Sequence, residues 1–315
     1  MKKTLYSAIE ERGAELSQNY EDKANGLPVI TSVSTGIASL DAYGLCEPSI
    51  LTVWEAHPGD GKTSVLQQLL KGAVSQGYTP KAYLFEDPIK LVADRYLAAE
   101  LGESAFKLRR LEIASEGIQA RLSSACRELD WTRQVIVEDI KMSSSELFVD
   151  LDTCDESTGL IGVDYAQAFD AEHDEKNVER VVARLAWGLN EFSKRTGISS
   201  NLFSQVKAEV QTRGKKWFDN WRFQKDRKGE DTTKADPVAV EGYRPLGGDA
   251  QWSTALWHKC KDAISIFRPG RWLNEHGLVC QDDVIEFLRV KGNYSPSKRP
   301  VRCRWNGSTS EIKDK

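Results

Sequence analysis

The chain has 315 residues, 29% of them charged, and a formal net charge of −4. This balance excludes a polycation, so any nucleic-acid site must be a local basic patch. No run approaches the roughly 18 apolar residues of a membrane span, and acidic residues arrive too early for a signal peptide. Six scattered cysteines without a C-x-x-C pair suit a reducing compartment, so we expect a cytoplasmic protein without a membrane partner.

Residues 4–18 have a helix-favouring composition, with Leu5, Ile9 and Leu16 at roughly helical spacing. Because this apolar stripe is thin, we expect the helix to pack on something else. We therefore divide the chain into an amino-terminal docking helix, residues 1–30, and an α/β domain, residues 31–315.

The most informative stretch is a glycine-rich turn between an apolar run of strand character, residues 49–54, and the start of a helix, residues 65–70. Its glycines let backbone N–H groups face a polyphosphate, and the helix N-terminus adds about half a positive charge. Lys62 would reach the β and γ phosphates, and the Thr63 hydroxyl would bind Mg²⁺. We predict that a nucleotide binds to Pro58, Gly59, Asp60, Gly61, Lys62, Thr63 and Ser64. The alternative is a glycine-rich turn without a ligand.

Strands and helices alternate after this loop. We predict strands over residues 81–85, 134–138, 159–164 and 198–203, and helices over residues 89–101, 105–129, 177–195 and from Ser143 onward. Carboxylates at strand ends lie where parallel α/β sheets bind ligands. Asp164 ends one of these strands and fits a Walker B aspartate that holds Mg²⁺ through water. The alternative is an ordinary aspartate that caps a turn.

Residues 206–248 form a long polar stretch, which we interpret as a functional loop. Seven basic residues between Arg213 and Lys228, set against Asp219 and Asp226, leave a local charge of about +5 in an acidic protein. Aromatic residues between them could stack on bases. We predict single-stranded DNA contacts from Arg213, Lys215, Lys216, Trp217, Arg222 and Lys225. Alternatively, this is a solvated loop whose tryptophans, spaced as on a helix face, pack against the core or a neighbouring subunit.

Residues 263–267, 283–290 and 301–305 are predicted to be closing strands, the last two forming a hairpin. The fold class is therefore α/β, with a mostly parallel sheet, helices on both faces and antiparallel strands at the carboxyl-terminal end.

Several ordered motifs resemble those of one family, the RecA-fold ATPase domain of DnaB-type replicative helicases, related to the phage helicase-primases and the mitochondrial helicase Twinkle. The resemblance covers roughly residues 35–306. It rests on the phosphate loop with Ala56 at its first position, on Leu84-Phe85-Glu86-Asp87-Pro88, on Gly162-Val163-Asp164-Tyr165-Ala166-Gln167, on Phe203-Ser204-Gln205, and on the segment from Gly247-Gly248 to Arg268.

The resemblance implies a P-loop ATPase that uses ATP and Mg²⁺, forms a homo-oligomeric ring, expected to be a hexamer, and moves on single-stranded DNA. It implies that Glu86 polarises the attacking water and that Gln205 senses the γ-phosphate. Lys291 fits a lysine that reaches the neighbouring subunit's ATP. The arginine expected two residues later is Asn293 here, and a shifted register would place Arg289 and Lys291 in these roles.

The same family places the protein in a bacterial or phage-infected cytoplasm, with a primase or a helicase loader as a possible partner. Two other functions stay open on the sequence. One is a RecA-like recombinase or clock-type ATPase, and the other is a nucleotide-gated assembly factor that hydrolyses ATP slowly. The assembly factor is suggested by the missing arginine, because an arginine finger can raise the rate of hydrolysis about 10³- to 10⁵-fold.

Overall fold

The computed structural model describes residues 4–26, 32–113, 116–139, 142–166, 178–250, 253–280, 283–292, 299–306, 309 and 311–315. The chain divides into two compact units, Met1–Ser32 and Val33–Lys315. The first contains α1 (Leu5–Ala24), which begins at Thr4, whose hydroxyl accepts a hydrogen bond from the Ser7 N–H at 3.1 Å. The predicted helix is confirmed and runs further than residue 18. Its side chains Leu5 and Ile9 are 78% and 60% exposed.

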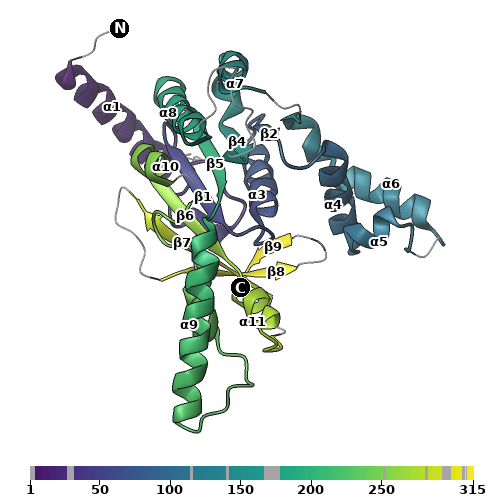
Figure 1. The fold of residues 1–315 in the computed structure, drawn as a ribbon. Helices are drawn as coiled ribbons and strands as arrows, with labels where there is room; N and C mark the ends of the chain where they lie inside the picture. The colour runs from purple at the N-terminus through teal and green to yellow at the C-terminus, as the bar shows by residue number, and fades with distance from the viewer. Residues whose placement is uncertain are drawn as a thin grey trace. The chain divides into compact units, whose positions relative to one another are not determined.

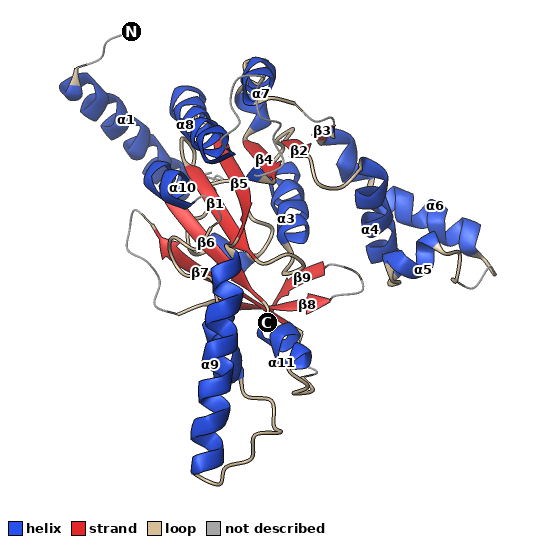
Figure 2. Ribbon diagram, viewed as in Figure 1, coloured by secondary structure: helices blue, strands red, loops and turns tan. Residues whose placement is uncertain are grey.

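The second unit is built on one sheet, coloured red in Figure 2. The nine described strands follow the order β3-β2-β4-β5-β1-β6-β7-β8-β9. Pairs from β3 to β6 are parallel, and those from β6 to β9 are antiparallel. The strands are β1 (Leu51–Ala56), β2 (Lys81–Leu84), β3 (Ile136–Glu138), β4 (Leu160–Asp164), β5 (Ser199–Gln205), β6 (Asp262–Phe267), β7 (Val284–Lys291), β8 (Val301–Asn306) and β9 (Glu311–Asp314). The predicted α/β class, with antiparallel strands at the end, is confirmed.

Helices cover both faces of this sheet, while α9 projects away from it and α5 and α6 lie off to one side (Figure 1). The helices of this unit are α2 (Ala38–Asp41), α3 (Lys62–Ser75), α4 (Ile89–Leu101), α5 (Ala105–Arg109), α6 (Ile118–Glu128), α7 (Ser144–Leu151), α8 (Val178–Thr196), α9 (Ala208–Arg227), α10 (Ser253–Lys259) and α11 (Pro269–Glu275), with 3₁₀ turns at η1 (Asp130–Gln134), η2 (Glu156–Thr158) and η4 (Pro237–Tyr243). The capping box predicted at Ser143 is present: its hydroxyl accepts from the Glu146 N–H, and the Glu146 carboxylate accepts from the Ser143 N–H. Among the described helices, none is long and apolar enough to cross a membrane.

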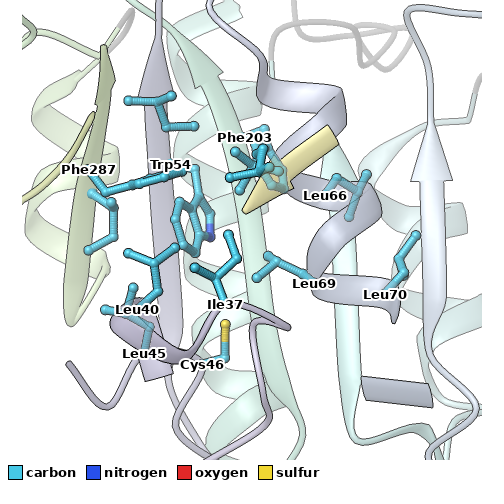
Figure 3. Close-up of a cluster of buried hydrophobic side chains, with 14 of the residues drawn as sticks. Ile37, Leu40, Leu45, Cys46, Trp54, Leu66, Leu69, Leu70, Phe203 and Phe287 are labelled. Atoms are coloured by element: carbon cyan, nitrogen blue, oxygen red, sulfur yellow. The ribbon is translucent and has the colours of Figure 1, made fainter. Parts of the chain in front are cut away.

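Two buried clusters hold the layers together. On one face, α3 contributes Leu66, Leu69 and Leu70 against Trp54 and Phe203, whose rings stack with centroids 6.0 Å apart (Figure 3). On the opposite face, α7, α8 and α10 pack on the alternate side chains of β1, β2, β4 and β5. Because strand side chains alternate between faces, both sets are apolar and the central strands are buried on both sides.

The predictions for two segments were wrong. Residues 105–129 do not form one helix, because α5 ends at Arg109 and α6 starts only after Gly117, which adopts a left-handed φ of 66°. Residues 206–248 are not a loop. They form the 20-residue helix α9 and the turn η4, which pack on each other through Phe218, Trp221, Val240 and Tyr243. The β7–β8 pairing is confirmed, although its connection at residues 293–298 lies outside the described residues.

Candidate nucleotide-binding site

The glycine-rich turn joins β1 to α3 in the backbone conformation that glycine permits. Gly59 and Gly61 have φ values of +79° and +101°, a region that other residues rarely adopt. A Cβ atom on Gly61 would also lie 2.9 Å from the Trp305 ring. The turn places the N-terminus of α3, a helix of 14 residues, at the carboxyl edge of the parallel strands. Backbone N–H groups and the helix dipole there favour a phosphate.

Lys62, Thr63 and Asp164 meet directly behind this turn. The Thr63 hydroxyl donates a 2.8 Å hydrogen bond to Asp164 Oδ2. Burial raises the pKa of Asp164 to about 6, while the charge of Lys62 and the Thr63 hydrogen bond lower it. Among the described residues, Asp164 Oδ1 has no hydrogen-bond partner. A hydroxyl beside a buried carboxylate with a spare oxygen is a ligand set that fits Mg²⁺.

Glu86 and Gln205 lie on the same edge of the sheet. Glu86 is exposed and follows β2 after one residue, and its charge contributes to raising the pKa of buried Asp164. Gln205 ends β5 and pairs with Ala56, the last residue of β1. The next residue, Val206, donates its N–H to the Ala56 carbonyl at 3.2 Å. The parallel strands therefore bring both predicted residues to the edge that carries the phosphate loop.

A brace that the sequence did not predict holds the phosphate loop from α11. Asp60 in the loop is 0% exposed, and its carboxylate is 2.8 Å from Arg271 Nη1. Arg271 also donates to the Pro58 carbonyl, and Arg268 donates to the Gly59 carbonyl at 3.3 Å. The sequence signal that could have predicted this brace is the acidic residue inside the phosphate loop. A buried carboxylate requires a cation or several hydrogen-bond donors nearby.

Lys291 and Arg289 are both engaged within the chain. Lys291 lies at the end of β7, where its ammonium donates to the Trp257 carbonyl. Arg289 is buried, 3.1 Å from Asp262 Oδ2, and donates to the Gly44 carbonyl at 3.1 Å. These contacts give Arg289 a structural role, which disfavours the shifted register. Asn293 lies outside the described residues.

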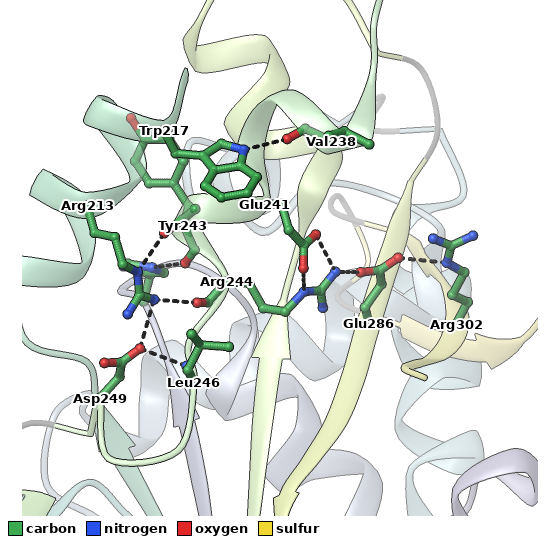
Figure 4. A network of polar contacts seen from close by, with 12 residues as sticks. Arg213, Trp217, Val238, Glu241, Tyr243, Arg244, Leu246, Asp249, Glu286 and Arg302 are labelled. Atoms are coloured by element: carbon green, nitrogen blue, oxygen red, sulfur yellow. Dashed lines mark hydrogen bonds and ion pairs between the residues drawn. The ribbon is translucent and has the colours of Figure 1, made fainter. Parts of the chain in front are cut away.

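The predicted DNA contacts on α9 divide into two groups. Three of them have partners within the chain. Arg213 donates to the Gly242 and Arg244 carbonyls and pairs with Asp249 at 2.8 Å, and Trp217 donates to the Val238 carbonyl (Figure 4). Lys225 pairs with Glu230. By contrast, Lys215, Lys216 and Arg222 are exposed on α9. The buried side of α9 carries Val210, Gly214, Phe218 and Trp221.

Comparisons with known proteins identify the family and the fold. A family model described as the DnaB-like helicase C-terminal domain matches residues 32–217. Two solved structures are similar in fold at 16% identity each. One is the structure of an ATPase domain, with a TM-score of 0.74 over 96% of this chain and 98% of that chain. The other is a DnaB-like replicative helicase described with its interactions with primase, with a TM-score of 0.73 over 100% of this chain and 68% of that chain.

A RadB recombinase structure is more distant, with a TM-score of 0.51 at 15% identity over 90% of this chain and 99% of that chain. No curated protein matches the sequence significantly.

Proposed function

Since the chain belongs to the family of DnaB-like helicase C-terminal domains, we propose that it is a ring-forming, Mg²⁺-ATP-dependent DNA helicase that translocates on single-stranded DNA. The observation that carries the proposal is the contact between the Thr63 hydroxyl and the buried Asp164 carboxylate, directly behind a glycine loop at positive φ. The Asp164 oxygen that lacks a hydrogen-bond partner among the described residues supports a metal ligand over an aspartate that only caps a turn.

Each site residue has a distinct task. Lys62 and the loop N–H groups bind the phosphates. Thr63 and Asp164 would hold Mg²⁺, which when bound would supply positive charge that stabilises the transferring phosphoryl group. Glu86, at the open edge, polarises the attacking water. We assign Gln205 the role of γ-phosphate sensor, as the family resemblance implies. The pairing of its strand with β1 next to the loop supports this assignment.

The first experiment measures ATP turnover with and without single-stranded DNA. Glu86→Gln should keep nucleotide affinity and abolish turnover, because the lost interaction is used only in the transition state. Asp87→Asn is the matched control: it removes the neighbouring carboxylate, which pairs with Arg95 at 2.7 Å, and should turn over nearly as the parent does. Turnover of Glu86→Gln at the parent rate would show that Glu86 is not the catalytic carboxylate.

For DNA, we propose that the exposed side of α9 follows the phosphate backbone. Replacing Lys215, Lys216 and Arg222 with alanine should weaken binding to single-stranded DNA and flatten its salt dependence, because fewer counterions are released. Replacing Lys107, Arg109 and Arg127, which are exposed on α5 and α6, makes the same charge change elsewhere and serves as control. Equal losses in both triple variants would mean that net charge, not α9, governs binding.

For assembly, we propose a ring, expected to be a hexamer, in which the exposed apolar side of α1 packs on the next subunit and Lys291 reaches that subunit's nucleotide. Lys291 would have to leave the Trp257 carbonyl to do so. Lys291→Ala should therefore lower turnover without lowering nucleotide affinity in an assembled ring. Light scattering that shows only monomer with Mg²⁺-ATP and single-stranded DNA present would refute the assembly.

One observation favours a second function. Arg289 is buried in an ion pair, so it is not placed to serve as a trans-acting arginine. A nucleotide-gated assembly factor with slow hydrolysis is consistent with that arrangement. The assembly-factor function predicts that DNA does not stimulate ATP turnover, whereas the helicase function predicts that it does.

For the helicase function, we expect a primase or a helicase loader as the protein partner.

A further inference from the structure

Aromatic rings in contact lead away from the phosphate loop. His57, the residue before Pro58, meets Trp272 of α11 edge to face, with ring centroids 4.7 Å apart. Trp272 in turn stacks on Tyr243 at 4.2 Å and 16°. Each of these rings is buried. The loop is therefore packed through two ring contacts against η4, the turn that lies along α9.

The contacts continue from Tyr243 to α9 itself. The Tyr243 hydroxyl forms a 2.8 Å hydrogen bond with Nε2 of His276. His276, at the end of α11, stacks on Phe218 in the middle of α9 at 3.8 Å and 11°. We call His57, Trp272, Tyr243, His276 and Phe218 the ring chain. It joins two parts of the protein with different proposed tasks, nucleotide binding and DNA binding.

Polar contacts fix the loop end of the ring chain. His57 Nε2 donates to the Tyr243 carbonyl at 2.7 Å, and burial lowers the pKa of His57 to about 4, so the imidazole is neutral at physiological pH. The indole N–H of Trp272 points to Asp60 Oδ2 at 3.4 Å. A movement of the phosphate loop would therefore displace both Tyr243 and Trp272.

Two glycines allow close packing at the α9 end of the ring chain. Gly214 of α9 lies so close to the Tyr243 ring that a Cβ atom there would overlap it, and Gly242 is similarly close to Trp217. Arg213 donates to the Gly242 carbonyl at 3.1 Å, next to Tyr243 (Figure 4). Closely packed interiors transmit displacements because they contain few voids that could absorb them.

We propose that Trp272, Tyr243 and His276 are positioning residues that couple the phosphate loop to α9, so that nucleotide in the loop strengthens the binding of single-stranded DNA to α9. This rests on the proposed function. The ring chain contacts α9 in its middle, at Phe218. The chain that continues from Gln205 at the end of β5 meets only the first turn of α9. The coupling is reciprocal, so DNA strengthens nucleotide binding by the same factor.

The test measures this factor directly. Single-stranded oligothymidylate affinity is measured with and without a non-hydrolysable ATP analogue and Mg²⁺, and analogue affinity with and without the oligonucleotide. In the parent, couplings of about 5- to 150-fold are typical of linked sites. His276→Ala removes the stack on Phe218 and the partner of the Tyr243 hydroxyl. It should bring the factor to nearly one while each affinity measured alone stays near the parent value.

Two further variants separate coupling from general damage. His276→Phe keeps a ring on Phe218 and should restore most of the factor, whereas Asn274→Ala removes only the contacts between Asn274 and Cys280 at the same end of α11. An unchanged factor in His276→Ala would overturn the proposal. An equal loss in Asn274→Ala would overturn it too, because the effect would then be structural.

A readout without DNA distinguishes this proposal from the function on which it rests. Amide hydrogen exchange around Phe218 should slow when the ATP analogue binds to the parent and should respond much less in His276→Ala. If the parent binds no single-stranded DNA but shows this slowing, the DNA-binding function fails, while the link from the phosphate loop to α9 stands. If exchange around Phe218 is unaffected by nucleotide in the parent, the coupling itself fails.

Discussion

Replacing Arg271 with alanine removes the cation that faces the buried carboxylate of Asp60. The two side chains are 28% and 0% exposed, with Arg271 Nη1 2.8 Å from Asp60 Oδ1. Removing one partner of a buried ion pair costs about 3–5 kcal/mol, because the remaining charge is uncompensated. Because water partly screens Arg271, we expect the loss of stability at this site to be no more than about 3 kcal/mol.

The loss of stability should depend on pH. Burial raises the pKa of Asp60 to about 6, and the charge of Arg271 lowers it, so the variant's Asp60 has a still higher pKa. A carboxyl whose pKa is raised in the folded state contributes stability below its unfolded pKa and loses that contribution as pH rises through the folded value. The Arg271→Ala penalty should therefore be small at about pH 5. Above about pH 6 it should grow by about 1.4 kcal/mol per pH unit, reaching about 2 kcal/mol near pH 7.5.

Urea unfolding of the parent and of Arg271→Ala at about pH 5 and about pH 7.5 measures this loss of stability. The double variant Asp60→Asn with Arg271→Ala leaves no buried charge and should recover most of the loss near pH 7.5. Glu275→Gln is the control, because it removes only the exposed partner of Arg271 at 2.9 Å, a contact worth about 0.3–0.5 kcal/mol. A penalty that is equal at both pH values, or that Asp60→Asn does not relieve, would refute the electrostatic account of the brace.

Three other outcomes follow from the structure. Glu55→Gln should gain stability over the parent as pH rises from about 5 to about 8 in urea unfolding, because burial raises the pKa of Glu55 well above its usual range and ionising it costs stability. Gly61→Ala should abolish nucleotide binding in a titration with ATP, because φ is +101° and Trp305 blocks the methyl group. Ser143→Ala should lower the unfolding free energy by about 1 kcal/mol, because α7 loses its capping box with Glu146.

Much of the α/β core could be predicted because its signals are local. The strands at residues 81–84 and 160–164 are short apolar runs, and the loop from Pro58 to Ser64 carries its own pattern of glycine, lysine and threonine. Parallel pairing then places the ends of these strands on one edge, so topology brings Thr63 and Asp164 to the same part of the sheet, where the structure shows their hydrogen bond.

The errors arose where packing between distant segments decides the structure. The stretch after Gln205 looked like a loop because its composition is polar, yet Val210, Gly214, Phe218 and Trp221 recur at helical spacing and bury one side of α9. That spacing was visible in the sequence, but its weight depended on η4 as a partner. Likewise, nothing near Asp60 in the sequence indicates that Arg271, more than two hundred residues later, is its counterion.

Strand separation on a forked DNA duplex tests the central claim most directly. With Mg²⁺-ATP, the parent should displace one strand. Glu86→Gln should displace none under the same conditions while still binding the fork. A parent that hydrolyses ATP in response to single-stranded DNA but separates no strands would contradict the helicase function and favour a recombinase-like ATPase.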